Sequence, residues 1–467
     1  MYGFYIDEDR RKARRAKWNT VRIISIGFFG VILLGSLLLW LPFSNHQPIR
    51  YIDALFTAVT CVCVTGLVTV VPAAQFTVAG KVILLILIQI GGLGIIACTT
   101  AFLILVGKRI NMKERVVIQE AYGLSTLQGM IRFIERVLWG TFLVEGIGAI
   151  GYSFQFIPEY GVAKGIFYSV FHSISAFCNA GVDILGDSSF TRYVNTPVIT
   201  ITTTMLVILS GLGYPVWIDL AKNIKMTIQS KGKRPVGRTI TRLSLQSKIV
   251  LTMTLFLLTL GTVGFYLLEH HNPATMGTLN AAGKFQAAFF QSVTTRTAGF
   301  ASVSQSGLTN GSKLLASMMI IGGSPAGTAG GIKTTTVAVL LLTAISVLRG
   351  NKDTECYGRK ITFEIIRVGI TITLVTFVFW LFGVTVMTVI EPQQKVLDLM
   401  FEATSAMATV GLTADLTPVL SDISHVVLML MMYIGRIGPM TMALIFSGHA
   451  DKKNQFRTLP EAKIMVG

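Results

Sequence analysis

Residues 401–412 read FEATSAMATVGL and lie between two long apolar runs. Three further segments share their outline, namely FTAVTCVCVTGL (56–67), FHSISAFCNAGV (171–182) and FFQSVTTRTAGF (289–300). In each segment a Phe precedes a Gly by ten residues, and a large apolar residue follows that Gly. The four glycines, Gly66, Gly181, Gly299 and Gly411, are 115, 118 and 112 residues apart. Spacing this regular indicates four copies of one structural unit, whereas four unrelated loops would vary in length.

The composition is that of a membrane protein. Of the 467 residues 52% are hydrophobic and only 13% are charged, against roughly 25% charged in soluble domains. Several apolar runs approach the roughly 20 residues that a helix needs to cross a bilayer. They lie at 23–41, 81–106, 249–268, 368–390 and 426–446. We therefore predict an all-α, polytopic membrane protein.

The basic residues indicate how the chain is oriented. Thirty of the 40 Lys and Arg residues fall in five segments, at 1–22, 107–136, 222–248, 349–367 and 449–467. The positive-inside rule places all five in the cytoplasm, so both termini are expected inside the cell and the number of spans is even. The net charge of +17 then reflects topology and attraction to anionic membrane lipid, and not binding to nucleic acid.

Between the basic segments each part of the chain holds an apolar run, a weakly amphipathic middle and another apolar run. We interpret this unit as a helix, a short re-entrant helix, a Gly-containing turn and a second helix. Irregular backbone at membrane depth is tolerated only where protein buries it or water lines it, so four such turns predict a shared pore. The expected parts are a basic tail at 1–22, repeats at 23–110, 133–222, 248–348 and 366–447, and a C-terminal tail at 448–467.

The turns have the chemistry of a cation site. The C-terminal end of a re-entrant helix carries partial negative charge, which favours a cation at the centre. Glycine permits backbone angles that let main-chain carbonyls point at an ion. Rings of carbonyls replace the hydration shell of K⁺ in potassium channels, so the turns predict a potassium filter. A sodium-selective or poorly selective cation pathway remains the alternative within transport.

Two further motifs extend the pattern, GGSPAGTAGGIKTTT (322–336) and YIGRIGPMTM (433–442). With the four turns, they make the chain resemble the Trk/Ktr/HKT superfamily of potassium transporters, most closely the Ktr-type bacterial membrane subunit. The resemblance covers essentially the whole chain. It implies four fused helix–pore-helix–helix repeats with eight spanning helices around a pseudo-fourfold pore, and K⁺ uptake through it. Whether Na⁺ acts as an activating or coupling ion stays open.

The resemblance also assigns site residues. The K⁺ filter would be formed by backbone carbonyls of three residues in each turn, which are Val64, Thr65, Gly66, Asn179, Ala180, Gly181, Thr297, Ala298, Gly299, Thr409, Val410 and Gly411. In the plant branch of the superfamily a serine at the first filter position goes with sodium permeation. The glycine at that position here, Gly66, favours potassium.

Passage below the filter would be controlled by an interrupted helix and by buried cations. The segment 322–333 contains Pro325 and too many glycines for a straight helix, and in the family it is an intramembrane gating loop; a passive hinge is the alternative. The expected gating residues are Gly322, Gly323, Gly327, Gly330, Gly331, Lys333 and Arg436. Arg436 would set a barrier to cations, unless it merely pairs with buried carbonyls.

Two other charges fall in apolar segments. Arg296 ends the third short helix, where we expect it to bond unpaired carbonyls and brace the turn; direct contact with the ion is the alternative. Glu145 is a lone carboxylate that either pairs with a basic residue or stays protonated. His172 is expected to make local hydrogen bonds and not to bind the ion.

No sequence pattern supports an enzyme or a bound nucleotide. The six histidines are scattered, the five cysteines form no zinc pattern, and GTAGGIKT lacks the spacing of a phosphate-binding loop. Similarity to the Ktr branch implies a homodimer, a cytosolic nucleotide-binding regulatory ring as partner, and a bacterial cell membrane as location. Any nucleotide control would then come from that partner. The basic cytoplasmic loops and the final residues 457–467 are the expected contact surfaces.

Overall fold

The computed structural model describes residues 24–105, 129–229 and 241–438, with a few isolated positions between 115 and 122. Most of the described chain is helical, and its only strands are β1 (Glu355–Cys356) and β2 (Arg359–Lys360), which form a small hairpin. The predicted tails, most of the basic loop at 107–136, part of the basic loop at 222–248 and the end of the 433–442 motif lie outside the described residues.

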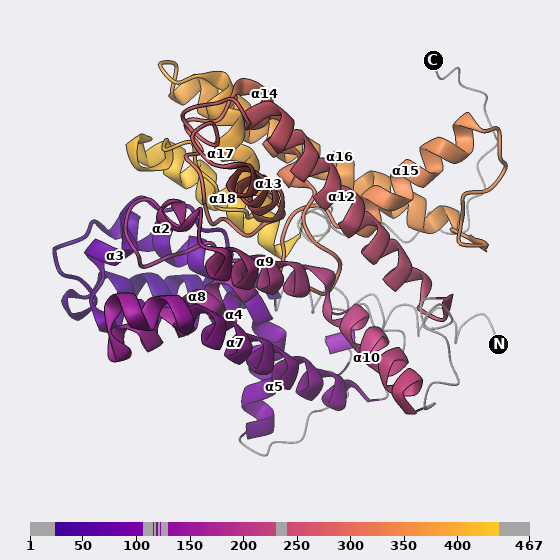
Figure 1. Ribbon diagram of the computed structural model, residues 1–467, viewed down its shortest axis with the longest axis horizontal. Coiled ribbons are helices and arrows are strands. Elements are labelled where there is room, and N and C mark those ends of the chain that lie inside the picture. Colours follow the sequence, from indigo (N-terminus) through magenta and orange to yellow (C-terminus); the bar gives the residue numbers. More distant parts are fainter. Residues whose placement is uncertain are drawn as a thin grey trace, which may run out of the picture.

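The helices recur in the order long helix, shorter helix, helix (Figure 1). The first group consists of Ile24–Trp40, α2 (Tyr51–Val62) and α4 (Val78–Leu93), and the second of α7 (Met130–Tyr160), α8 (Val162–Cys178) and α9 (Pro197–Leu212). The third consists of α12 (Leu245–Glu269), α13 (Ala281–Thr294), α14 (Asn310–Ala316), η3 (Ser317–Ile320) and α15 (Thr334–Leu348). The fourth consists of α16 (Phe363–Ile390), α17 (Val396–Ala408) and α18 (Asp422–Ile437). Short elements and continuations complete the chain, namely η1 (Pro42–Ser44), α3 (Pro72–Gln75), α5 (Ile95–Leu105), η2 (Thr191–Tyr193), α10 (Tyr214–Gln229) and η4 (Thr417–Val419).

Several of these helices are apolar enough to lie in a membrane. Within the described residues α7, α12 and α16 are each long and apolar enough to cross it, and α9 with α10 forms a fourth candidate that bends by 97°. Shorter apolar helices include Ile24–Trp40, α2, α4, α8 and α15. The fold is thus the expected helical one with several apolar helices, while the eight spans remain a prediction.

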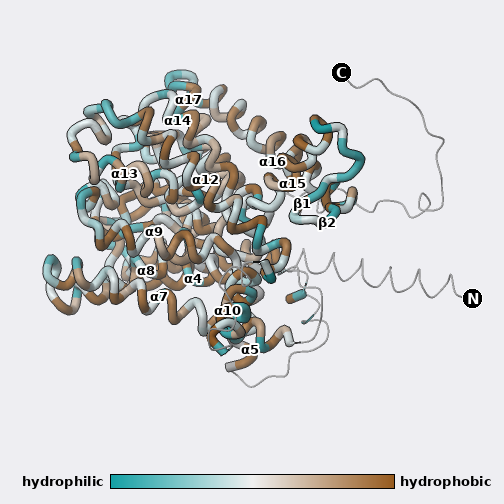
Figure 2. The backbone as a smooth tube through the Cα atoms, turned by 45° about the vertical axis from the view of Figure 1, so that its right-hand side comes forward, coloured by the Kyte–Doolittle hydropathy of each residue, from teal (hydrophilic) through white to brown (hydrophobic). Residues whose placement is uncertain are grey.

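Burial separates the helices into an inner and an outer set. The last eight residues of the inner helix α17 are all buried. The outer helices instead expose large apolar side chains, with Trp139 77%, Phe154 72% and Phe382 68% exposed. Figure 2 shows the same distribution as brown segments along α7, α12 and α16. Apolar side chains outside and polar groups inside are what a lipid surround requires.

A buried ion pair fixes the start of α17. Lys313 Nζ of α14 donates to Asp398 Oδ1 at 2.6 Å, and both side chains are largely buried. Asp398 lies in the first turn of α17, as Asp53 does in α2, where a carboxylate also complements the positive end of the helix dipole. Asp53 also has a cation beside it, because Arg50 Nε donates to it at 2.8 Å.

Removing one partner of the buried pair should therefore destabilise the fold. Asp398→Asn is expected to cost about 3 kcal/mol, since it leaves Lys313 charged and buried without its partner. The double change Lys313→Met with Asp398→Leu should restore most of that loss. The melting temperature of the purified protein in detergent measures both effects. The matched control is the exposed pair Lys360–Asp353, also 2.6 Å long, where Asp353→Asn should change stability by less than about 1 kcal/mol. Equal losses at the two sites would contradict the prediction.

Candidate cation site

The four sequence turns adopt one unusual backbone conformation. Each follows a short helix, α2, α8, α13 or α17, and places the residue two before its glycine at positive φ. These residues are Val64 (φ 55°), Asn179 (59°), Thr297 (71°) and Thr409 (52°). The glycines follow at φ 104°, 63°, 83° and 96°. Positive φ is rare outside glycine, above all for a β-branched residue such as Val64, so the surrounding structure must impose it.

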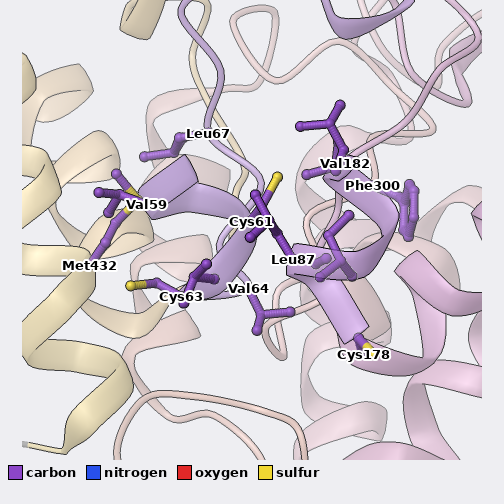
Figure 3. Close-up of a cluster of buried hydrophobic side chains, with 14 of the residues drawn as sticks. Val59, Cys61, Cys63, Val64, Leu67, Leu87, Cys178, Val182, Phe300 and Met432 are labelled. Carbon is purple, nitrogen blue, oxygen red and sulfur yellow. The ribbon is translucent and has the colours of Figure 1, made fainter. Parts of the chain in front are cut away.

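The four glycines meet around one centre. A Cβ on Gly66 would lie 2.6 Å from the carbonyl oxygen of Ala180, and one on Gly181 would lie 2.7 Å from that of Ala298. The same atom on Gly299 would overlap the Val410 oxygen, and on Gly411 it would overlap the Thr65 oxygen. Each turn therefore contacts the next, and the fourth contacts the first, which closes a ring. Figure 3 shows side chains from three turn regions, Val64, Val182 and Phe300, in one buried cluster beside this ring.

The carbonyls that precede the glycines are available to a ligand. The amides of Thr65, Ala180, Ala298 and Val410 donate to their own short helices at 2.8–3.0 Å, but no described residue donates to the carbonyls of these four. The C-terminal ends of four helices meet at the same place and add partial negative charge. Unpaired carbonyls are otherwise rare in protein interiors, so this arrangement is suited to a dehydrated cation.

The third turn differs from the others by one residue. In three turns the amide before the glycine bonds a carbonyl five residues earlier, whereas Ala298 bonds Thr294, four residues earlier. Phe290, and not Phe289, is accordingly the buried counterpart of Phe56, Phe171 and Phe401. The ten-residue spacing from Phe to Gly therefore located the third turn, but the Phe at that spacing, Phe289, is not the residue that corresponds to the Phe of the other three repeats.

The interrupted helix lies against the ring. Residues 321–333 run as irregular backbone between η3 and α15, closed by a parallel bridge between Ile321 and Ile332. A Cβ on Gly330 would overlap Thr409 Oγ1 and lie 2.8 Å from the Ala408 oxygen, and Thr328 Oγ1 donates to Phe177 O at 3.1 Å. The loop thus touches the ends of two short helices. Its glycine is needed where the backbone approaches this closely.

Arg436 and Lys333 hold this loop in place. Arg436 Nη1 donates to Thr328 O at 2.5 Å, and Nη2 donates to the carbonyls of Gly91 and Gly92. Lys333 Nζ donates to Ala329 O at 2.6 Å. The arginine therefore joins the loop to α4 across the centre of the protein. Arg436 thus pairs with buried carbonyls, which was the alternative expectation for this residue. These hydrogen bonds are also compatible with a role as a barrier to cations.

Three second helices end at a glycine of one conformation. The residues are Gly94 (φ 83°), Gly213 (φ 85°) and Gly438 (φ 98°), which follow α4, α9 and α18. Ser324 N of the loop donates to Gly211 O at 2.9 Å, next to one of these ends. A Cβ on Gly213 would overlap the Pro325 oxygen, so this helix end also lies directly against the loop.

The two isolated charges, Arg296 and Glu145, have different surroundings. Arg296 borders a small opening with Ser292, Thr295 and Met318, and its Nε has no hydrogen-bond partner among the described residues. The expected bracing bond is therefore absent at that nitrogen. Glu145 of α7 accepts a bond of 3.1 Å from the Gln89 amide of α4, so its partner among the described residues is neutral and not basic, and protonation of the carboxyl group stays the expectation.

The other predicted local contacts are present. His172 Nδ1 lies 2.7 Å from Tyr168 O within an aromatic cluster, and Asn179 Oδ1 accepts from Ser210 Oγ at 3.2 Å. Both side chains are thus engaged within the protein, although Asn179 Nδ2 has no partner among the described residues.

Sequence reasoning missed two kinds of residue around the ring. Glu402 of α17 is wholly buried, and its carboxylate accepts bonds from the Thr413 and Thr417 hydroxyls and the Ala414 amide at 2.5–2.8 Å. These bonds hold in place the irregular segment that follows the fourth turn. A buried hydroxyl near the end of each short helix was also missed, although a Ser or Thr stands five or six residues before every ring glycine.

Comparison with known proteins shows which proteins the chain resembles. The family model TrkH, described as a cation transport protein, matches residues 6–457. The chain is 36% identical over 461 residues to the Ktr system potassium uptake protein B of Bacillus subtilis, covering 98% of this chain and 99% of that protein. It is 35% identical over 463 residues to the potassium/sodium uptake protein NtpJ of Enterococcus hirae, covering 98% and 99%. The crystal structure of the potassium transporter TrkH from Vibrio parahaemolyticus superposes with a TM-score of 0.68 at 18% identity, covering 91% of this chain and 85% of that one.

Proposed function

The chain belongs to the TrkH family of cation transport proteins, and from that membership we propose that it carries K⁺ into the cell through the ring of four turns. It is a membrane transport protein of this family and not an enzyme. Beyond family membership, the proposal assigns the transported ion, the residues of the filter and the residues of the gate. The filter consists of the residues assigned above, with the carbonyls of Thr65, Ala180, Ala298 and Val410 as the innermost ligands.

One observation carries the proposal. Four carbonyls that accept no described hydrogen bond lie around one centre, each against the glycine of a neighbouring turn. Four buried acceptors with no donor would be costly unless something else bonds them. A dehydrated K⁺ ion bonds several carbonyls at once and so satisfies them. Similarity to a protein named for potassium uptake supports the same ion.

The gate is assigned to the loop below the ring. Residues 322–333 with Lys333 and Arg436 would open and close the path, because they lie directly against the turns and hold one another by hydrogen bonds. In the other three repeats the second helix ends at a glycine of positive φ, Gly94, Gly213 or Gly438.

A second candidate ion is sodium. One relative is named a potassium/sodium uptake protein, so a pathway that selects less strongly between K⁺ and Na⁺ is the second candidate function. Na⁺ as an activating or coupling ion belongs to the same question. Gly66 at the first turn, where serine accompanies sodium permeation in the plant branch, favours potassium.

Relatives that are parts of a Ktr system suggest the setting in which the chain works. We assign it to a bacterial cell membrane, as a homodimer with a cytosolic regulatory ring that binds nucleotide. Support comes from the names of two relatives, each a Ktr system potassium uptake protein B. Co-purification of the chain with such a ring, and the size of the complex in detergent, test both assignments.

Ion uptake tests the function. Cells that lack their own potassium uptake systems should regain growth at low K⁺ when they express the chain, and should take up K⁺ with saturable kinetics. Na⁺ at tenfold excess should reduce the rate by less than half. Failure to restore K⁺ uptake by protein that reaches the membrane would refute the proposal, and equal competition by Na⁺ would favour the second candidate.

A further inference from the structure

Each short helix has one buried hydroxyl that bonds the turn of its own repeat. These residues are Thr60, Ser175, Thr294 and Ser405, and none is more than 1% exposed. The main-chain oxygen of each also accepts the amide that precedes the ring glycine. The four therefore occupy one structural position, even though the shorter third turn moves Thr294 by one residue in the sequence.

The hydroxyls bond the turns in two ways. In the first and fourth repeats the hydroxyl oxygen accepts from the glycine amide, Thr60 from Gly66 at 2.9 Å and Ser405 from Gly411 at 3.0 Å. In the second and third repeats the hydroxyl donates instead to the carbonyl after the glycine. Ser175 bonds Val182 O and Thr294 bonds Phe300 O, both at 2.6 Å.

The first kind of bond sets the direction of a filter carbonyl. The amide of Gly66 and the carbonyl of Thr65 belong to one peptide unit, and a peptide unit is planar and trans. When Thr60 holds the amide on the helix side, the carbonyl must point the opposite way, toward the ring centre. Ser405 does the same for the Val410 carbonyl through Gly411.

The second kind of bond acts on the other side of the glycine. The carbonyls of Val182 and Phe300 are tied back to their helices, so they are engaged by protein and not free for an ion. The ring thus has two restrained amides and two restrained outer carbonyls. Different atoms therefore hold the four turns in place, although the four hydroxyl-bearing residues occupy corresponding positions.

We propose that Thr60, Ser175, Thr294 and Ser405 are positioning residues for ion selection, which orient the filter backbone without touching the ion. This inference rests on the proposed potassium function. It predicts that loss of a hydroxyl alters ion affinity and discrimination more than the maximal rate. Thr60 and Ser405 should have the larger effect, because they act on the peptide unit whose carbonyl faces the ring.

The experiment removes each hydroxyl and compares it with a neighbour. The test variants are Thr60→Val, Ser175→Ala, Thr294→Val and Ser405→Ala. Three matched controls remove buried hydroxyls in α2, in α8 and directly after α13 that bond only a carbonyl of that helix, in Thr57→Val, Ser169→Ala and Thr295→Val. Uptake kinetics give KM and maximal rate for K⁺ and inhibition by Na⁺, with protein in the membrane quantified. The rise in melting temperature that K⁺ causes in purified protein gives a second reading of ion binding.

Thr60→Val and Ser405→Ala should raise KM about three- to tenfold, the scale of one lost hydrogen bond, and weaken discrimination against Na⁺. Thr60→Ser, which keeps the hydroxyl, should behave as the parent, and the controls should keep the parental KM. Parental KM and selectivity in the test variants, or equal changes in the controls, would overturn the inference. So would failure of all four test variants to reach the membrane, because the hydroxyls would then serve folding.

The outcome also separates this inference from the proposed function. If the parent chain takes up K⁺ and a ring-glycine variant loses affinity while the hydroxyl variants do not, only the inference about the hydroxyls fails. If the parent chain gives no K⁺ uptake, the proposed function itself fails.

Discussion

Gly411→Ser should remove high-affinity potassium uptake. Position 411 has φ 96°, and any Cβ there would overlap the carbonyl oxygen of Thr65 in the first turn. A side chain in left-handed backbone costs about 1–2 kcal/mol before that overlap is counted. Because the displaced oxygen is one of the proposed K⁺ ligands, KM for K⁺ should rise at least about tenfold, equivalent to 1.4 kcal/mol or more. Uptake kinetics in cells without other potassium systems measure this.

Gly66→Ser should change KM in the same direction, since its Cβ would lie 2.6 Å from the Ala180 oxygen. The matched control is Gly146→Ala in α7, where an added Cβ meets nothing within 4 Å and where KM should not change. If both serine variants reach the membrane with parental KM for K⁺, the four turns are not the filter.

Arg436→Ala should increase the maximal rate of uptake and leave ion selectivity largely intact. The guanidinium is within the protein and bonds the loop at Thr328 and α4 at Gly91. At an effective dielectric constant of about 20, one positive charge on the order of 8 Å from a K⁺ ion opposes it by about 2 kcal/mol. Removing it also releases the loop. We expect the maximal rate per protein to rise about three- to tenfold and K⁺ preference over Na⁺ to stay within about a factor of two.

Arg436→Lys separates the two contributions of this residue. A lysine retains the positive charge but cannot bond Thr328 O and the α4 carbonyls with one planar group. A rate close to the parental one would attribute control to the charge, and a rate as high as that of Arg436→Ala would attribute it to the hydrogen bonds. Unchanged uptake in Arg436→Ala, with normal protein levels, would exclude this arginine from the gate.

Much of the arrangement followed from simple patterns. The regular spacing of Gly66, Gly181, Gly299 and Gly411 predicted four equivalent turns, and the structure brings these glycines together. Glycine clustering predicted the irregular backbone at 322–333, because glycine and proline disfavour helix whatever surrounds them. In both cases local backbone chemistry decides the outcome, so the sequence is sufficient.

Other features depend on partners that are distant in the chain. The bond between Lys313 and Asp398 joins residues 85 positions apart, and that between Arg436 and Gly91 joins residues 345 positions apart. Neither pairing has a local signal. The missing bond at Arg296 Nε has the same cause, because the unpaired carbonyls at a helix end could be anticipated but not the direction of the side chain. The hydroxyls were missed because Ser and Thr are common in such helices and only the contact with the turn distinguishes Thr60 from Thr57.

The closed order of contacts, in which each turn touches the next along a single polypeptide, has a genetic consequence. In a pore assembled from four identical chains, one codon change alters every quadrant at once. Here it alters one quadrant, so a mutation at Gly66 leaves the contributions of Gly181, Gly299 and Gly411 in place. In the proposed filter, natural variation can therefore change the ion preference through one of the four turns at a time.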